Sequence, residues 1–297
     1  MEDLISIERI LVPVDYSDYS VQACRYALRI AEKTGACLTF FHAFYSPAFD
    51  LIELTGNKSV QKKLRDDVTS KLMVTEEEKL KHFEKIVLAY PEAGKISKDQ
   101  LSFEICAGLA NEEILDFSAK YQPHIVVMGT RGNDKKENSF IGSTTEYAIR
   151  KLRCPVLAVP EHFKLKDDIA SNNILYLTDF DESDFLSIKL LLGFTQTMGM
   201  TIHCLHIGNK KDKWEEMKMN GLREYFRTVY NNSFVECNIV SSGENILDAI
   251  DRYITEKNIR LISLTTRKRN IYSKYFKPDI TRKIFHHSSI PLLVFHS

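Results

Sequence analysis

The sequence predicts an α/β protein built from two tandem doubly wound domains, each with a five-stranded, mainly parallel sheet. Two observations lead to this expectation. An internal repeat spans the chain, and within each copy short apolar runs alternate with segments of helical periodicity. The length of 297 residues suits two ordinary domains, and a hydrophobic content of 44% allows each to bury a core.

The repeat is visible in two blocks that occur in the same order in both halves. The segment RILVPVD, which begins at Arg9, aligns without a gap with NILYLTD, which begins at Asn173. The later block HIVVMGTR at His124 aligns with RLISLTTR at Arg260. We therefore expect two homologous domains at residues 1–160 and 171–297, joined by a polar linker at 161–173.

The first elements of copy one follow from short-range signals. Residues 9–14 form an apolar run that predicts a buried strand. Asp15 and the Tyr-Ser-Asp that follows it supply residues that cap helices, and apolar residues then recur at helical spacing as far as Gly35, a typical helix terminator. The apolar run at 37–44 predicts the second strand.

The later elements of copy one are read in the same way. Residues 57–90 are long, charged and periodic, which favours a helix. Residues 111–121 place three apolar side chains on one face of a second helix. The remaining expectations are strands at 101–106, 125–128 and 156–159, and a helix at 143–152.

Ligands of such sheets bind outside the carboxyl ends of the strands. The loop after Met128 has the composition of a phosphate cradle: Gly129-Thr-Arg-Gly132 is followed, nine residues later, by Gly142-Ser-Thr. Glycines let main-chain N–H groups approach an anion, and a helix start adds free N–H groups and a positive dipole end. Arg131, Lys135 and Lys136 offer countercharge.

Neither the GxxxxGK[ST] loop nor the GxGxxG fingerprint occurs in this segment. The chemistry of P-loop enzymes is therefore not expected here. Three turn glycines without any ligand are the alternative interpretation.

Asp15 ends the first strand at the same edge of the sheet. It is either a helix cap, or a carboxylate that binds a ribose hydroxyl or holds Mg²⁺ through water. The backbone groups of Pro13 and Val14 could pair with an adenine edge. Val14, Ala43 and Met128 would form an apolar slot for the ring.

These residues resemble those of a known family. ILVPVDYSDYS together with the spacing G-x2-G-x9-G-S is similar to the universal stress protein family, in its ATP-binding branch, and the resemblance extends over both halves. It implies an adenine nucleotide alpha hydrolase-like fold and bound ATP. The residues that it assigns to ATP are Pro13, Val14, Asp15, Ala43, Met128, Gly129, Arg131, Gly132, Gly142, Ser143 and Thr144.

Members of this family pair through their last strands. Here residues 156–159 and 292–295 would pair within one chain to form a pseudo-dimer, with a homodimer as a further level of assembly. Such pairing also protects two sheet edges.

The second copy departs from the motif. Of the three proposed site residues at the end of the first strand, Pro13, Val14 and Asp15, only Asp15 has an identical counterpart, Asp179. Proline lacks an N–H group and aspartate repels phosphate, so we expect no ATP binding in the family manner by this copy. The cradle residues Gly129, Gly132, Gly142 and Ser143 align with Thr265, Lys268, Pro278 and Asp279.

The sequence favours an ATP-binding regulatory protein of the stress response, with an unidentified protein partner. A slow ATPase or phosphotransferase and a nucleotide-free scaffold are the alternatives. No catalytic constellation can be assembled, and His203 and His206 would lie on opposite faces of a strand rather than bind a metal. The basic run at 267–277 is expected to be a solvated loop.

Composition excludes several classes of protein. A net charge of zero and a pI near 7.1 argue against a dedicated nucleic-acid or anionic-membrane binder. No apolar run has the length of a membrane span, and the N-terminus lacks the features of a signal peptide. Six cysteines without a CxxC pair predict reduced thiols in the cytoplasm.

Overall fold

The computed structural model describes most of the chain, in two compact units. The N-terminal unit comprises Glu8–Glu137 and Ile141–Leu152, and the C-terminal unit is mainly Arg153–Ser297. The boundary lies before residue 160, where the first repeat was expected to end, and the domain boundaries remain a prediction. The described residues are 6–54, 57–131, 141–163, 173–180, 182–198, 200–209, 212–230, 235–241, 246–266 and 290–296.

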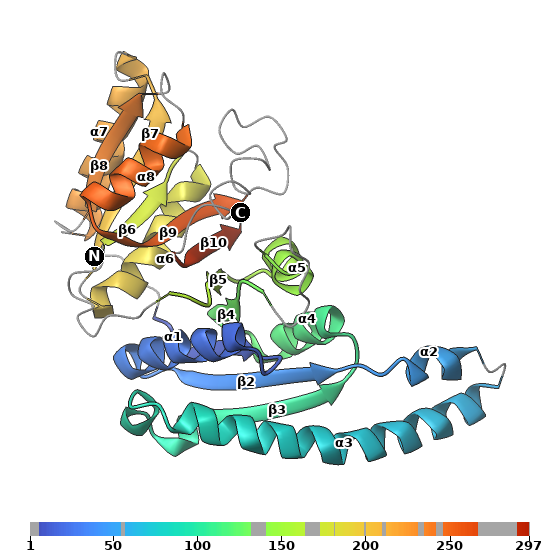
Figure 1. Cartoon of the computed structure of the whole chain (residues 1–297). Helices are drawn as coiled ribbons and strands as arrows, with labels where there is room; N and C mark the ends of the chain where they lie inside the picture. The colour runs from blue at the N-terminus through green and yellow to red at the C-terminus, as the bar shows by residue number, and fades with distance from the viewer. Residues whose placement is uncertain are drawn as a thin grey trace. The chain divides into compact units, whose positions relative to one another are not determined.

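The N-terminal unit alternates strands and helices as the sequence predicted. Its strands lie in the order β3-β2-β1-β4, and each neighbouring pair is parallel. Figure 1 shows α3 running alongside β3 and beyond it toward α2, a short helix that the sequence did not predict. The elements are β1 (Arg9–Pro13), α1 (Asp18–Thr34), β2 (Cys37–Phe44), α2 (Ala48–Glu53), α3 (Lys58–Leu88), β3 (Leu101–Ala107), α4 (Ala110–Tyr121), β4 (Ile125–Gly129) and α5 (Ser143–Lys151), with 3-10 turns at Ala93–Lys95 and Lys98–Gln100.

Local chemistry explains where the helices of this unit begin and end. Ser17 caps α1, because its side chain accepts a hydrogen bond from the backbone N–H of Ser20. Gly35 ends the same helix with φ 73°, a left-handed conformation that costs glycine little. Asn57 caps α3 by accepting from two backbone N–H groups of the first turn. The helix cap after β1 is therefore Ser17 and not Asp15.

The C-terminal unit repeats this alternation. Its strands lie in the order β5-β10-β9-β6-β7-β8. The expected pairing of the last strands is confirmed: β10 runs antiparallel to β5, with Leu292 opposite Ala158. The elements are β5 (Val156–Val159), β6 (Asn173–Leu177), α6 (Glu182–Met198), β7 (Thr201–Gly208), α7 (Lys213–Tyr230), β8 (Val235–Ser241), α8 (Ile246–Glu256), β9 (Ile259–Thr266) and β10 (Leu292–His296).

The predicted α/β class with a mostly parallel sheet is confirmed. The central strands are deeply buried: Ile10, Leu11 and Val12 of β1 and Ile174 and Leu175 of β6 have no exposed surface. This burial is typical of parallel strands covered by helices on both faces. Within the described part of the chain, no helix combines the length and the apolar character that crossing a membrane requires. The basic run at 267–277 lies outside the described residues.

Candidate functional site

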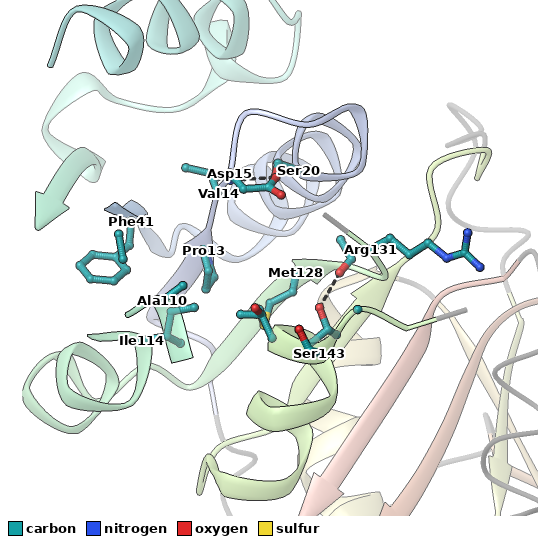
Figure 2. Close-up of a pocket in the computed structure, with 15 residues that line it drawn as sticks. Pro13, Val14, Asp15, Ser20, Phe41, Ala110, Ile114, Met128, Arg131 and Ser143 are labelled. Atoms are coloured by element: carbon teal, nitrogen blue, oxygen red, sulfur yellow. Dashed lines mark hydrogen bonds between the residues drawn. The ribbon is translucent and has the colours of Figure 1, made fainter. Parts of the chain in front are cut away.

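A cavity of about 260 Å³ opens at the carboxyl ends of β1 and β4 in the N-terminal unit. Its volume is close to the lower end of the range of small-molecule sites, roughly 300–1,000 Å³. Figure 2 shows its walls coming from several separate segments. The lining residues are Pro13, Val14, Asp15, Ser20, Phe41, Ala43, Ala110, Ile114, Met128, Gly129, Arg131, Gly142, Ser143, Thr144 and Thr145.

The cavity brings together the residues that the sequence singled out. All of the predicted site residues line it except Gly132, which lies outside the described residues together with Lys135 and Lys136. Their role toward a nucleotide stays a prediction.

One wall of the cavity is apolar. Val14 and Met128 are buried there, and Phe41 stacks on Phe117 with ring centroids 4.5 Å apart. The sequence reasoning missed this wall in part, because it did not examine the loop after the third strand. That loop leads into the start of α4, and the rule that ligands bind at strand ends applies to it equally. The lining residues not predicted are Ser20, Phe41, Ala110, Ile114 and Thr145.

The backbone of Val14 is already engaged within the protein. Its N–H donates to the carbonyl of Phe41 at 2.9 Å, and its carbonyl lies 2.7 Å from Nδ1 of His42. Pro13 has no N–H group at all. The Val14 N–H is therefore already used within the protein, and the expectation that backbone groups of Pro13 and Val14 pair with an adenine edge stays a prediction.

Asp15 takes part in the turn between β1 and α1. Its Oδ1 accepts from the N–H of Ser17 at 3.1 Å, from the hydroxyl of Ser17 at 2.6 Å, and from the hydroxyl of Ser20. These bonds hold the carboxylate at the rim of the cavity. The sequence offered helix cap and ligand contact as alternatives, and the structure shows a third arrangement in which Asp15 orients the residues that cap α1.

The start of α5 forms the opposite rim. Gly142 occupies the N-cap position and makes no side-chain cap hydrogen bond, while its own N–H donates to Thr130 O at 2.7 Å. The hydroxyl of Thr145 donates to the carbonyl of Gly129 at 2.8 Å and so joins α5 to the end of β4. The first N–H groups of a helix have no partner within it, so this rim suits an anion.

Gly129 has a steric role besides any contact with a ligand. A Cβ atom there would lie 2.7 Å from Tyr19 Cβ and 2.8 Å from the Tyr19 carbonyl carbon. Contacts this short are not tolerated, so glycine is required where β4 passes the first turn of α1. The side chain of Arg131 extends away from the other labelled residues (Figure 2).

Behind the cavity, His42 connects the sheet to α3. Its Nε2 lies 3.6 Å from Glu76 Oε2, and its ring is 4.3 Å from that of Tyr16. Tyr16 has φ 64°, an uncommon value for a residue with a side chain. Burial, and secondarily the charge of Glu76, raises the pKa of the Tyr16 hydroxyl, which therefore stays protonated.

The equivalent place in the C-terminal unit is filled by a buried polar cluster. Asp184 accepts hydrogen bonds from the Tyr176 hydroxyl at 2.9 Å and the Thr178 hydroxyl at 2.7 Å. The hydroxyl of Thr265, which aligns with Gly129, lies 2.8 Å from the Tyr176 hydroxyl and donates to Ser187 Oγ at 2.7 Å. All five side chains are buried, so the cluster occupies this corner.

No group of three or more potential metal-ligating side chains occurs among the described residues. Among the residues that the structure describes, Asp15 is the single carboxylate that lines the cavity. Mg²⁺ characteristically takes one or two carboxylates and completes its shell with water and phosphate oxygens. Asp15 fits that role only when a phosphate ligand supplies the other oxygens.

Comparisons with known proteins agree with this architecture. Residues 6–160 match the model of the universal stress protein family. Universal stress protein MJ0531 of Methanocaldococcus jannaschii is 29% identical over 153 residues, which cover 51% of this chain and 81% of that protein.

Among solved structures, a universal stress protein from Archaeoglobus fulgidus DSM 4304 covers 97% of this chain and 98% of its own, with a TM-score of 0.69 and 19% identity. This likeness shows the fold alone. A universal stress protein in complex with cAMP covers 53% of this chain and 99% of its own, with a TM-score of 0.34 and 16% identity.

Proposed function

Because this chain belongs to the universal stress protein family, we propose that its N-terminal unit binds one adenine nucleotide, ATP, in the cavity at the ends of β1 and β4. The observation that carries this proposal is the convergence of the predicted residues on a single cavity with one apolar wall and one helix-start rim. A nucleotide has the same division into an apolar base and an anionic phosphate chain. We propose that the base lies against Val14, Ala43 and Met128.

The phosphates are assigned to the start of α5. Main-chain N–H groups there, with the hydroxyls of Ser143 and Thr144, would donate to the phosphate oxygens. Gly142 leaves this rim without a side chain that would compete for the same donors. Asp15 would contact a ribose hydroxyl, or hold Mg²⁺ through water where the phosphates supply its other ligands.

We propose nucleotide binding rather than rapid hydrolysis. Hydrolysis needs a group that orients the attacking water. Asp15 is the only carboxylate among the described residues that line the cavity, and its Oδ1 already accepts three hydrogen bonds. The C-terminal unit is proposed not to bind ATP, because the polar cluster around Asp184 fills the corresponding corner.

The proposed role is regulatory, in a cytoplasmic protein. A ligand that binds only the folded state stabilises it by about 2.7 kcal/mol at 100 times its Kd. We propose that bound ATP also favours one conformation of the cavity rim, and so changes the surface that the N-terminal unit presents to a protein partner.

The direct test is native mass spectrometry of the purified full chain, followed by titration calorimetry of the nucleotide-free protein with ATP. We expect one ATP per chain, and negligible phosphate release. Two nucleotides per chain would contradict the assignment of the C-terminal unit, and no binding at millimolar ATP would contradict the proposal as a whole.

A matched pair of variants at Gly142 tests the position of the phosphates. Asp and Asn are equally good N-cap residues and have nearly the same shape, so both variants should fold. Gly142→Asp places a negative charge at the rim and should weaken ATP binding about 100-fold or more, whereas Gly142→Asn should weaken it far less. Equal affinities of the two variants, measured by calorimetry, would move the phosphates away from α5.

A further inference from the structure

Two cysteines lie opposite each other on neighbouring strands of the C-terminal unit. Cys204 of β7 and Cys237 of β8 are register partners in a parallel pairing. Register partners project to the same face of a sheet, and adjacent strands are about 4.8 Å apart. A disulfide requires Cα atoms roughly 4.4–6.8 Å apart, so the two backbones are already positioned for one.

The equivalent place in the N-terminal unit holds no sulfur. Cys204 aligns with Phe40, and Phe40 is the register partner of Phe103. These two rings stack with centroids 4.8 Å apart. The fold therefore accepts an ordinary apolar pair at this position, and the cysteine pair is a particular feature of the second half.

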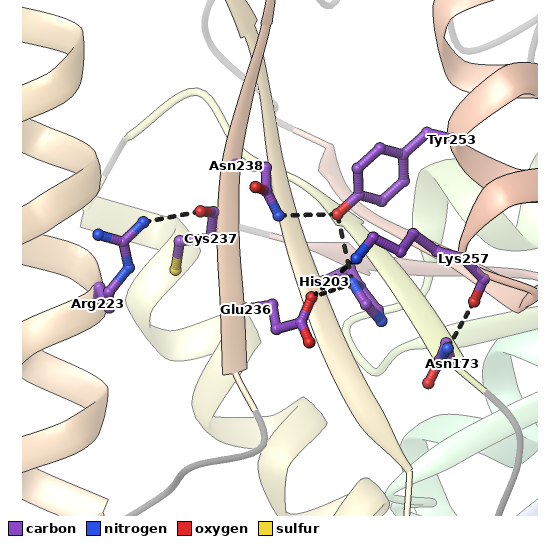
Figure 3. Close-up of polar contacts among 8 residues, drawn as sticks. All are labelled: Asn173, His203, Arg223, Glu236, Cys237, Asn238, Tyr253 and Lys257. Carbon is purple, nitrogen blue, oxygen red and sulfur yellow. Dashed lines mark hydrogen bonds and ion pairs between the residues drawn. The ribbon is translucent and has the colours of Figure 1, made fainter.

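The surroundings distinguish the two thiols. Figure 3 shows Cys237 on the side of β8 that faces Arg223 of α7, while His203 and Tyr253 lie on the other side. The guanidinium of Arg223 donates to the Cys237 carbonyl at 2.8 Å. A hydrogen bond from Cys204 lowers the pKa of the Cys237 thiol, burial opposes this shift, and the charge of Arg223 adds to the lowering. The same hydrogen bond, and then burial, raises the pKa of Cys204.

We propose that Cys204 and Cys237 are a dithiol modification site that a small peroxide converts into a reversible cross-strand disulfide. The Cys237 thiolate attacks the peroxide, takes up one oxygen atom as sulfenic acid, and releases hydroxide. The Cys204 thiol then attacks the Cys237 sulfur. The S–S bond forms, and the oxygen leaves as water with the proton of Cys204.

Access to this pair comes through an edge of the sheet. Cys204 has no exposed surface, and Cys237 is 5% exposed. Strand β8 ends the strand order of the C-terminal unit, and in the described part of the chain it pairs with β7 alone. Edge strands open locally more readily than central ones, and peroxide is small enough to enter through such an opening. The thiols closer to solvent, Cys37, Cys106 and Cys154, are the competitors that a test must separate.

The test is peptide mapping of the reduced full chain before and after exposure to hydrogen peroxide. Free thiols are alkylated with N-ethylmaleimide in denaturant, and the digest is analysed without reductant. We expect one peptide pair joined through Cys204 and Cys237, a fall from six alkylated thiols to four, and full reversal by dithiothreitol. A disulfide that includes Cys37 or Cys106 in place of this pair would overturn the proposal.

Single variants separate the two roles. In Cys204→Ser, Cys237 should accumulate sulfenic acid that dimedone traps, whereas in Cys237→Ser the remaining Cys204 should not react. Cys24→Ser removes a buried thiol outside the pair and should leave the cross-link intact. Dimedone labelling of Cys204 but not of Cys237 would contradict the assigned order of attack.

Thermal unfolding of the wild-type chain gives an independent readout that needs no variant. The disulfide closes the loop that contains α7, and should raise the Tm of the C-terminal unit by roughly 5–10 °C. A cross-link that forms only after the chain has been unfolded in urea would show that the native sheet does not present the pair.

Discussion

The two units differ in how side chains pack at two equivalent positions. These are the end of β4 in the N-terminal unit and the end of β9 in the C-terminal unit. At the first, Gly129 has no side chain and the first turn of α1 approaches its backbone. At the second, Thr265 packs into a cluster of hydrogen-bonded side chains with Tyr176 and Ser187. The fold tolerates either a small residue beside a cavity or a polar cluster whose members satisfy one another.

Other features are the same in both halves. Tyr16 and Phe180 both have a left-handed backbone, with φ 64° and 60°. Their rings lie 4.3 Å and 4.1 Å from those of His42 and His206, and each histidine places Nδ1 2.7 Å from the carbonyl two residues before the aromatic ring. Because both halves keep this arrangement while only one keeps the cavity, we attribute it to the shape of the turn rather than to a ligand.

The largest expected effect comes from removing the carboxylate of the polar cluster. Asp184→Ala leaves the hydroxyls of Tyr176 and Thr178 and the N–H of Asp179 without their acceptor. We expect the C-terminal unit to lose roughly 3–5 kcal/mol of stability in urea unfolding. The matched change in the other half, Ser20→Ala, should cost about 1 kcal/mol. Equal losses would show that the two corners do not differ energetically.

A smaller effect is expected from giving the first corner the residue of the second. Gly129→Thr forces a Cβ into the backbone of Tyr19 and should destabilise the N-terminal unit by about 2–3 kcal/mol. The control is Gly94→Thr, because nothing lies within 4 Å of a Cβ at Gly94. Thermal unfolding of both variants measures the difference. A well-folded Gly129→Thr protein that still binds ATP would remove the steric argument.

The two halves are also expected to differ in how their stability responds to pH. On the face of β7 that carries α8, His203 Nδ1 lies 3.3 Å from the Glu236 carboxylate and 3.3 Å from the Tyr253 hydroxyl. The Lys257 ammonium lies 3.4 Å from the Glu236 carboxylate. Burial lowers the pKa of His203, Glu236 acts in the opposite direction, and Lys257 adds to the lowering. Since unfolded His203 binds a proton more readily, its contribution to stability is complete above its unfolded pKa of about 6.5 and is lost as pH falls through the lower folded value.

The smallest expected effect follows from this asymmetry. The register position of His203 and Glu236 is occupied in the N-terminal unit by Thr39 and Ser102, which do not titrate. The free energy of unfolding of the C-terminal unit, measured between pH 7.5 and 5, should therefore fall as the pH falls. His203→Gln should reduce the slope of this free energy against pH by an amount equivalent to a fraction of a proton taken up on unfolding. His162→Gln, at a side chain 87% exposed, should not change it. An unchanged slope in the His203 variant would assign the pH dependence to other groups.

The elements of the first repeat were predictable because each depends on neighbours in sequence. The strands at Cys37–Phe44 and Val156–Val159 have the bounds that their apolar runs predicted, and α3 differs from its predicted range by only a few residues. The short helix Ala48–Glu53 was missed because its six residues show too little periodicity to be recognised.

Most residues around the cavity were also predictable, because the ends of parallel strands meet at one edge of a sheet. What each residue does there was not. The sequence could not show that the N–H of Val14 is already bonded to Phe41, or that Asp15 serves the turn before α1.

The sequence by itself determined the alternation of strands and helices, the internal repeat and the loops after β1, β2 and β4 that line the cavity, since these follow from periodicity and from glycine and cap residues close together in the chain. Only the tertiary structure decided which side chains meet across the sheet. The alignment of Cys204 with Cys237, the approach of Tyr19 to Gly129 and the cluster around Asp184 all depend on strand register and helix packing. Register is set by the cooperative burial of whole elements, so no short stretch of sequence contains it.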